Sequence, residues 1–285
     1  MAQSLSAATC SEIERVTRLC QRLEFFVAQP PLKVQALSQG ESNQSYYVKT
    51  AQGEYVLRCY PADAVVCRQQ ELRCQHAAAA KGLAPAPLCL NNHYQVMLSD
   101  YIAGTEPFEY RHHGRDKLLA TLAQFHQLSV QTVRLDYQAY LLQLAAAVDA
   151  DIRLLNHVQL AAKWLNSNSA DIVLCHLDLH QGNILVRGAR LWLLDFEYSQ
   201  QADSCLDLAA IVEHFNLDDK AAAVVVHDYA KHRATAELEV LLHAQMPQAR
   251  LVYAGFCWLW YLAMPGCQQQ AQHWQQRVTQ LSKML

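Results

Sequence analysis

The sequence predicts an α+β protein with a small, sheet-rich N-terminal lobe and a larger, mainly helical C-terminal lobe. In the first hundred residues, short runs of Val, Tyr and Leu alternate with turn-forming residues, as in antiparallel strands. After about residue 105 the apolar residues recur at helical spacing. Hydrophobic residues make up 52% and charged residues 17% of the 285-residue chain, which is enough apolar material for a sizeable core. We expect an N-terminal lobe over 1–98, a hinge over 99–104 and a C-terminal lobe over 105–285.

The N-terminal lobe begins with a predicted helix near residues 11–27, where Ser11 and Glu14 have capping-box spacing. Between residues 32 and 60, three strand-like runs are separated by QGESN and AQG, both typical of turns. The Ala-rich segment that follows predicts one helix that stops at Gly82. Two more strands are predicted around an NNH turn. Together these elements predict a five-stranded antiparallel sheet with one crossing helix.

The C-terminal lobe is predicted from two long segments with helical apolar faces, at residues 116–130 and 136–166. Short strands return near residues 172–174, 184–186 and 191–194. Beyond Asp203 the chain is predicted to be helical to its end. Breaks are expected at 217–219, at Met246-Pro247 and at 264–266.

Composition argues against several classes of partner. The formal net charge is -3 and the chain has no Lys/Arg block, so a nucleic-acid partner is not expected. No run approaches about 18 apolar residues and the N-terminus lacks a leader pattern, so we expect no membrane partner and a cytoplasmic protein. The ten cysteines are scattered without a CxxC pair, which indicates reduced thiols. The thirteen histidines show no zinc-site spacing.

The polar residues that carry chemistry follow the order used by kinases. The chain has neither GxxxxGK[ST] nor GxGxxG, which excludes the P-loop and Rossmann modes of holding phosphates. The remaining mode uses a strand-borne cation, a metal-binding Asp and Asn, and a base. Candidates for these roles occur in that mode's order along the chain: Arg58, Asp178, Asn183 and Asp195.

Each candidate fits phosphoryl transfer chemically. A carboxylate at Asp178 can accept or orient the proton of an attacking hydroxyl. Asn183 and Asp195 offer the hard oxygen ligands that Mg²⁺ prefers. Taken singly, such residues more often cap loops, but the ordered set favours a catalytic site.

These residues lie in motifs that resemble the protein-kinase-like small-molecule kinases: aminoglycoside phosphotransferases, choline kinases and, most closely, the bacterial thiamine kinases. The resemblance covers about residues 32–265. Its motifs are HLDLHQGN (176–183), LLDFEYS (193–199), CLDLAA (205–210), LSQGESNQSYYV (37–48), YVLR (55–58), Glu71 and the later HDYA (227–230). The family often has glycine where this chain has Leu177.

The resemblance implies a protein-kinase-like two-lobe fold that uses ATP and Mg²⁺. Arg58 would bridge phosphate oxygens, as a planar guanidinium can, and Glu71 would orient it. His176 and Asp207 would support the loop that carries Asp178. The other implied ATP contacts are Gly40, Ser42 and Asn43 at the phosphates and the backbone of Ser99 and Tyr101 at the adenine.

The acceptor substrate is less well defined by the sequence. Trp258 and Tyr261 fall on one face of a predicted helix, where aromatic rings can bind a cation or simply pack. Glu197 and Glu213 are acidic candidates to balance such a cation. We therefore expect a small-molecule alcohol substrate, thiamine first and choline or ethanolamine next. The last third has no dense acidic run, which disfavours aminoglycosides. The alternative of another class is a nucleotide-binding pseudokinase or interaction protein, although no base or metal ligand has been lost.

Overall fold

The computed structural model describes residues 2–37, 43–61 and 66–285. The chain forms two compact units, of which unit 1 comprises Met1–Glu106 and Trp192–Glu197 and unit 2 comprises Pro107–Leu191 and Tyr198–Leu285. The segment Trp192–Glu197 thus belongs with the N-terminal unit although it lies far along the chain. The hinge at 99–104 and the boundaries on either side of it stay predictions.

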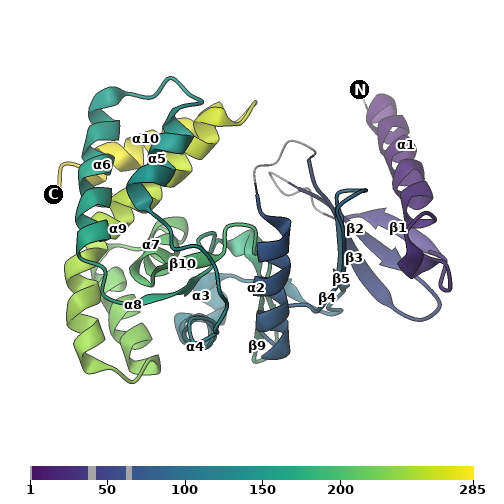
Figure 1. Cartoon of the computed structure of the whole chain (residues 1–285), viewed down its shortest axis with the longest axis horizontal. Helices are drawn as coiled ribbons and strands as arrows, with labels where there is room; N and C mark the ends of the chain where they lie inside the picture. Colours follow the sequence, from purple (N-terminus) through teal and green to yellow (C-terminus); the bar gives the residue numbers. More distant parts are fainter. Residues whose placement is uncertain (1, 38–42, 62–65) are drawn as a thin grey trace. The chain divides into compact units, whose positions relative to one another are not determined.

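Unit 1 contains the predicted five-stranded antiparallel sheet, which the structure confirms. Its strands have the order β1-β2-β3-β5-β4. Helices α1 (Ala2–Cys20) and α2 (Arg68–Ala80) lie on opposite sides of this sheet (Figure 1). The strands are β1 (Lys33–Ala36), β2 (Gln44–Lys49), β3 (Glu54–Cys59), β4 (Pro87–Asn91) and β5 (Val96–Asp100).

The first helix differs from its prediction near residues 11–27, which is wrong at both ends. Ser11 lies inside α1, because the preceding Ala-rich residues favour continuation of the helix toward the N-terminus. Beyond Cys20 the chain leaves the helix, and Leu23 and Phe26 are 1% and 2% exposed in the core. Only a short 3₁₀ helix, η1 (Glu24–Phe26), follows.

The alternation of β3 determines where Arg58 lies. Tyr55, Leu57 and Cys59 pack into the core between α1 and the sheet, so the residues between them face the other side. On that side Arg58 meets Glu71 of α2. The buried core on the α1 side consists of Val16, Cys20, Leu23, Phe26, Tyr46, Val48, Leu57, Val96 and Leu98.

Unit 2 is mainly helical, and its longest element, α9 (Ala236–Ala263), packs against five other helices. These are α5 (Tyr137–Ala145), α6 (Ile152–Ser167), α7 (Cys205–His214), α8 (Asp219–His232) and α10 (Gln268–Leu281). Two shorter helices, α3 (Tyr110–His113) and α4 (Arg115–Phe125), come earlier in the chain. α4 packs against α8.

The three short strands predicted in the later part of the chain are all present. β7 (Ile172–Cys175) pairs antiparallel with β10 (Gln200–Asp203). A second small sheet has the order β6-β8-β9, from β6 (Glu106–Pro107), β8 (Ile184–Arg187) and β9 (Arg190–Leu193). Residues 176–183, here called the catalytic loop, connect β7 to β8 and end in a 3₁₀ helix, η2 (Gln181–Asn183).

The break predicted at Met246-Pro247 is wrong, because α9 continues through Pro247. A proline inside a helix removes one hydrogen bond and costs about 3 kcal/mol. Side chains of α9 are buried both before and after Pro247, among them Leu242 and Leu251, and this packing offsets the cost. The breaks predicted at 217–219 and 264–266 are confirmed, since α7 ends at His214, α8 begins at Asp219, and α9 and α10 flank 264–267.

The described cysteines are free thiols. Among the helices within the described ranges, none combines the length and apolar character needed to cross a membrane.

Gly255 allows α6 and α9 to approach closely. A Cβ atom at this position would overlap the Val158 side chain of α6. Val158 is 0% exposed, so it has little room to move away. The contact therefore requires glycine although glycine is a poor helix former.

We predict that Gly255→Ala destabilises the protein by about 1–3 kcal/mol, the usual cost of overpacking, although Ala elsewhere in a helix would stabilise it by about 1 kcal/mol. Urea denaturation measures the change. In a Val158→Ala background the same substitution should cost clearly less, because the colliding methyl groups are gone. Equal costs in both backgrounds would show that the helices are not in contact here.

Candidate active site

The catalytic loop brings Asp178 and Asn183 together. The side-chain amide nitrogen of Asn183 donates to the backbone oxygen of Asp178 at 3.0 Å and to its Oδ2 at 2.7 Å. Asn183 is 8% exposed, so this pairing is well protected. Because the amide nitrogen is used for Asp178, the amide oxygen is the atom that suits a hard cation such as Mg²⁺. The Asn183 side chain therefore fits the predicted ligand role.

Asp178 is held in its ionised form. The Nε2 atom of His180 lies 3.6 Å from Asp178 Oδ2. Burial alone would raise the pKa of the Asp178 carboxyl, but the His180 hydrogen bond and the nearby histidines lower it below its ordinary value. An ionised carboxylate can accept a hydrogen bond from an alcohol, as the predicted role of Asp178 requires.

Asp207 of α7 anchors the start of the catalytic loop. Its carboxylate is 0% exposed. Oδ2 accepts the backbone N–H of His176 at 2.7 Å, and Oδ1 accepts that of Leu177 at 2.7 Å. Oδ2 also lies 2.9 Å from Nε2 of His126. These contacts fit the predicted supporting role of Asp207. His176 is likewise fully buried, with its ring 6.1 Å from that of Phe125.

Leu177 adopts a left-handed backbone conformation, with φ of 66°. This region favours glycine, which explains why related sequences often have glycine here. A leucine in this conformation costs about 1–2 kcal/mol. The two hydrogen bonds from the loop backbone to Asp207 hold it there.

In unit 1, Arg58 is held by two carboxylates. Its Nη1 atom lies 2.9 Å from Glu71 Oε1, and its Nη2 atom contacts Asp195 Oδ2. Burial alone would lower the pKa of the Arg58 guanidinium, but Asp195 and Glu71 outweigh burial and raise it. Arg58 therefore carries a full charge, and the pairing with Glu71 is the one predicted from sequence.

Arg68 also belongs to this cluster, although it was not predicted from the sequence. Its Nη1 atom bridges Glu71 Oε2 and Glu197 Oε2, each at 3.0 Å. Its guanidinium lies 3.7 Å above the ring of Tyr60, whose hydroxyl donates to Glu71 at 3.2 Å. The i,i+3 spacing of Arg68 and Glu71 on one helix was the available signal. Glu197 is thus ion-paired within unit 1, and its role as a counter-charge for a substrate stays a prediction.

The structure describes three of the five other residues predicted to contact ATP, namely Asn43, Ser99 and Tyr101. Gly40 and Ser42 lie outside the described residues. The Asn43 side chain donates to Glu197 Oε2 at 3.0 Å and is 4% exposed. Ser99 lies in β5, opposite Val56 of β3. The Tyr101 N–H donates to the Glu54 carbonyl at 3.1 Å, so this donor is used within the sheet.

The two aromatic residues predicted to share one face of α9, Trp258 and Tyr261, differ in burial. Trp258 is 1% exposed, which favours the packing alternative over substrate binding. Trp260 is only half-buried, and its Nε1 donates to the Tyr198 hydroxyl at 2.9 Å. Its ring lies 4.9 Å from the half-buried ring of Tyr261 in a T-shaped contact. Because two residues turn a helix by about 200°, Trp258 and Trp260 point in nearly opposite directions.

Glu213 is neutralised by two arginines, so its prediction as a substrate counter-charge is not supported by the structure. Arg250 Nε lies 2.6 Å from Glu213 Oε1, and Arg277 makes a two-point contact with the same carboxylate. Glu213 is 5% exposed. These partners come from α9 and α10, far along the chain, and no local pattern indicates them.

His214, the next residue, lies beside the catalytic loop. Its ring is 5.5 Å from that of His180, and its Nε2 atom is 2.9 Å from the Tyr253 hydroxyl. Burial and the neighbouring His180 lower the pKa of His214 to about 4. It is therefore a neutral, partly apolar group at neutral pH. The sequence analysis did not single it out.

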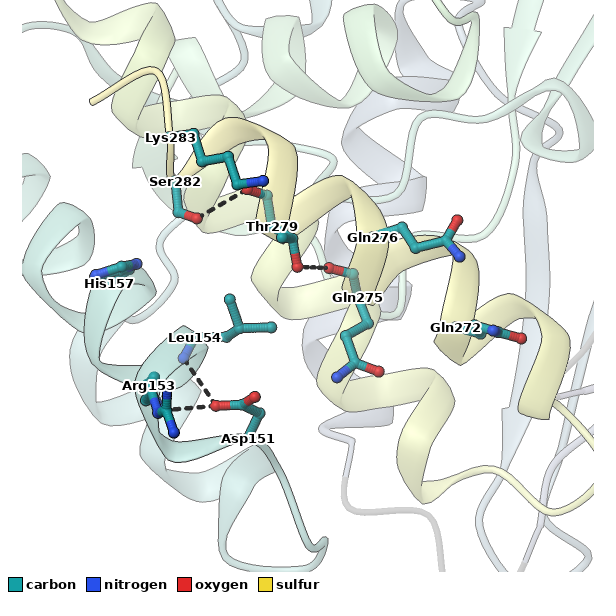
Figure 2. Close-up of a pocket in the computed structure, with 10 residues that line it drawn as sticks. All are labelled: Asp151, Arg153, Leu154, His157, Gln272, Gln275, Gln276, Thr279, Ser282 and Lys283. Carbon is teal, nitrogen blue, oxygen red and sulfur yellow. Dashed lines mark hydrogen bonds between the residues drawn. The ribbon is translucent and has the colours of Figure 1, made fainter.

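A separate cavity of about 500 Å³ lies between α6 and α10 of unit 2 (Figure 2). Asp151 caps the start of α6 there, accepting the N–H groups of Arg153 and Leu154. The α10 side is mostly glutamine, with Gln272, Gln275 and Gln276. None of the predicted site residues lines this cavity.

Comparison with known proteins identifies the family. Residues 33–241 match the model of the phosphotransferase enzyme family. The chain belongs to this family. The match includes both the Arg58 cluster and the catalytic loop, so the prediction of a small-molecule phosphotransferase is confirmed at the family level.

A named relative is similar in sequence to part of the chain. Protein LicA of Haemophilus influenzae is 34% identical over 100 residues, which are 32% of this chain. The match spans only 27% of that relative's length.

Solved structures share the fold at low identity. Choline kinase LicA from Streptococcus pneumoniae superposes with a TM-score of 0.80 at 17% identity, covering 95% of this chain and all of that one. A choline/ethanolamine kinase family protein from Mesorhizobium loti gives 0.78 at 17% identity, with 94% of each chain covered. A spectinomycin phosphotransferase in complex with ADP and spectinomycin gives 0.63 at 14% identity, covering 92% of this chain and 97% of that one. These similarities confirm the predicted protein-kinase-like fold.

The backbone conformation of Leu177 leads to a prediction about two truncations. Leu177→Gly and Leu177→Ala remove nearly the same side chain, but only glycine relieves the left-handed conformation. We expect the Gly variant to be more stable than the Ala variant by about 1 kcal/mol in urea denaturation.

The matched control is Leu179, which is 0% exposed and is not among the residues with positive φ. There the order should reverse, with Leu179→Gly less stable than Leu179→Ala by about 0.5–1 kcal/mol. The same order at both positions would contradict the left-handed conformation of Leu177.

Proposed function

We propose that this protein is an ATP-dependent kinase that phosphorylates the hydroxyl of a small cationic alcohol. The observation that carries the proposal is the catalytic loop, in which Asn183 orients an ionised Asp178. The names of its relatives favour choline or ethanolamine as the acceptor, and thiamine is the next candidate. All three combine a hydroxyl with a cationic centre.

On the nucleotide side, Arg58 is the proposed cation for the ATP phosphates. Glu71 orients its guanidinium, and the carboxylates of Asp195 and Glu71 keep Arg58 charged although burial alone would lower its pKa. A guanidinium offers several N–H donors in one plane, which suits two phosphate oxygens at once. Ser99 and Tyr101 stay the proposed backbone contacts for the adenine, with Tyr101 acting through its carbonyl.

Asn183 and Asp195 are the proposed ligands of Mg²⁺. The amide oxygen of Asn183 and the carboxylate of Asp195 are hard oxygen donors, and Asp195 contacts the charged Arg58. When bound, Mg²⁺ neutralises charge on the phosphates during transfer.

On the acceptor side, Asp178 is the proposed group that orients the substrate hydroxyl. The hydroxyl donates a hydrogen bond to the carboxylate, and its oxygen attacks the γ-phosphorus. A new O–P bond forms while the bond from the γ-phosphorus to ADP breaks. Because the pKa of Asp178 is lowered, the carboxylate is a weak base. Its main contribution is to hold the oxygen in line, and the proton passes to the Asp178 carboxylate as transfer proceeds and then to solvent.

The cationic part of the acceptor is proposed to meet the aromatic corner formed by Tyr198, Trp260 and Tyr261. Two of these rings are in edge contact and two share a hydrogen bond, so the corner is rigid. Aromatic faces attract quaternary ammonium and thiazolium groups. This corner replaces the Trp258 face inferred from the sequence.

Aminoglycosides are a weaker second candidate. A spectinomycin phosphotransferase shares the fold, but acceptors with several amines need unpaired acidic groups. Here Glu197 and Glu213 are both paired with arginines. A nucleotide-binding pseudokinase would be favoured only if no alcohol is phosphorylated.

A direct test is incubation with ATP and Mg²⁺ and separate acceptors, namely choline, ethanolamine, thiamine, a sugar and an aminoglycoside, with mass spectrometry of the products. We expect a phosphate ester of one of the cationic alcohols. Unimpaired ATP binding without any product would instead favour the pseudokinase. A phosphorylated aminoglycoside alone would replace the proposed acceptor class.

We predict that Asp178→Asn lowers kcat by about 10²–10⁴-fold, because the amide is no longer a charged acceptor for the hydroxyl. The affinity for ATP, measured by calorimetry, should change little. The control is Asp149→Asn on an exposed surface position, which should leave kcat unchanged. A full rate in the Asp178 variant would refute the proposed role of this residue.

If the aromatic corner binds the acceptor, a substitution in it should change the KM of the acceptor and leave the KM of ATP nearly unchanged. Trp260→Ala should raise the KM of the cationic acceptor by about 5–30-fold, equivalent to about 1–2 kcal/mol of lost cation–π energy, and leave the KM of ATP within about twofold. Trp164→Ala is the matched control, since Trp164 is a partly exposed tryptophan of α6. Equal changes in both KM values would show that Trp260 acts on folding instead.

A further inference from the structure

A chain of buried and partly buried hydrogen bonds links both ends of β7 to Tyr229 of α8 and to Arg233, which directly follows this helix. At the C-terminal end of β7, the backbone N–H groups of His176 and Leu177 donate to Asp207. Nε2 of His126 lies 2.9 Å from the same carboxylate, and Nδ1 of His126 lies 2.6 Å from the Tyr229 hydroxyl. Tyr229 belongs to α8 and is 0% exposed.

The chain continues from Tyr229 to the other end of the strand. Arg233, which directly follows α8, donates through Nη1 to the Tyr229 hydroxyl at 2.5 Å. The same guanidinium makes a two-point ion pair with Asp171, at 2.9 and 3.0 Å. Asp171 directly precedes β7, whose last residue is Cys175. One side chain of α8 and the residue that caps this helix therefore hold the start and the end of the strand that leads into the catalytic loop.

The direction of each hydrogen bond follows from the chemistry of the groups. An ionised carboxylate only accepts, so Nε2 of His126 must carry the proton that faces Asp207. In a neutral imidazole, Nδ1 then has no proton and must accept the Tyr229 O–H. Arg233 donates to the Tyr229 oxygen, whose single proton therefore points to His126. Only one neutral tautomer of His126 satisfies every contact: the Asp207 carboxylate selects the Nε2–H form, and the Tyr229 hydroxyl occupies the remaining lone pair on Nδ1.

Both ring nitrogens of His126 are used in this way. His126, Cys175 and Asp207 lie close enough for one metal ion, with ligand atoms within 4.8 Å of one another. The hydrogen bonds leave His126 no lone pair for a metal. The cluster is therefore a hydrogen-bonded relay and not a metal site.

We propose that Tyr229 is a positioning residue for the catalytic loop. Its hydroxyl hydrogen-bonds Nδ1 of His126 and so holds the imidazole with Nε2 toward Asp207, which completes the set of donors around the carboxylate that fixes the backbone of His176 and Leu177. Tyr229 is part of the HDYA sequence at 227–230, and it touches neither substrate in this scheme. The proposal rests on the phosphoryl-transfer function proposed above, because the loop it positions carries Asp178.

The first test is Tyr229→Phe, which removes one hydroxyl and keeps the ring. We expect kcat to fall about tenfold, the lower end of the loss seen when outer hydrogen-bond partners are removed, with both KM values unchanged. The matched control is Tyr137→Phe. Tyr137 is also 0% exposed, and its hydroxyl accepts the Asp203 N–H at 2.9 Å outside the relay. An equal fall in kcat in both variants would show a general stability effect and overturn the proposal.

The second test asks whether Tyr229 acts through His126. In a His126→Gln background, Tyr229→Phe should change kcat by less than about twofold, because the imidazole that Tyr229 holds is no longer present. A full tenfold effect in that background would overturn the proposal.

A third readout does not depend on activity. In protein labelled with ¹⁵N-histidine, the His126 signals, assigned by their loss in His126→Gln, should report a proton on Nε2 alone. Tyr229→Phe should shift the Nδ1 signal, because this nitrogen loses its hydrogen-bond partner. An unchanged His126 spectrum would contradict the proposal even if the enzyme phosphorylates none of the acceptors tried. If the wild-type protein transfers no phosphate but the spectrum shifts as expected, only the proposed function fails.

Discussion

The geometry of the catalytic loop depends on one buried carboxylate, that of Asp207. A fully buried charge is costly unless every lone pair is satisfied, and here two backbone N–H groups and one imidazole N–H satisfy it. The same contacts hold Leu177 in a conformation that leucine otherwise avoids. Asp178 directly follows Leu177 in the chain. The orientation of Asp178 therefore depends on Asp207, which takes no part in the chemistry.

In unit 1, partly buried charged side chains are likewise stabilised by partners of the opposite sign. Arg58, Arg68, Glu71, Asp195 and Glu197 neutralise one another in a partly buried cluster. Removing Arg58 or Arg68 would leave a buried carboxylate with fewer cationic partners, which is more costly than a lost surface ion pair. The cluster thus keeps Arg58 charged and oriented in a site where burial alone would favour its neutral form.

The sequence predicted those features that depend on local patterns. Strand-like runs between turn-forming segments predicted the five strands, and the HLDLHQGN motif placed Asp178 and Asn183 in one loop. Features that depend on distant partners were not predictable in this way. Glu213 looked like an available acid because its arginines come from α9 and α10, and Trp258 looked like a binding residue because periodicity does not tell which face of a central helix meets other helices. Pro247 looked like a break because the packing that holds α9 together is tertiary.

The most direct measurement of this account is amide hydrogen exchange at His176 and Leu177. If Asp207 holds the loop, both amides should exchange as slowly as those of the neighbouring strand β7 in the wild-type protein, and Asp207→Asn should speed their exchange by at least about tenfold while β7 stays protected. Fast exchange at both positions in the wild-type protein, or equal protection in the variant, would contradict the claim that this carboxylate sets the loop.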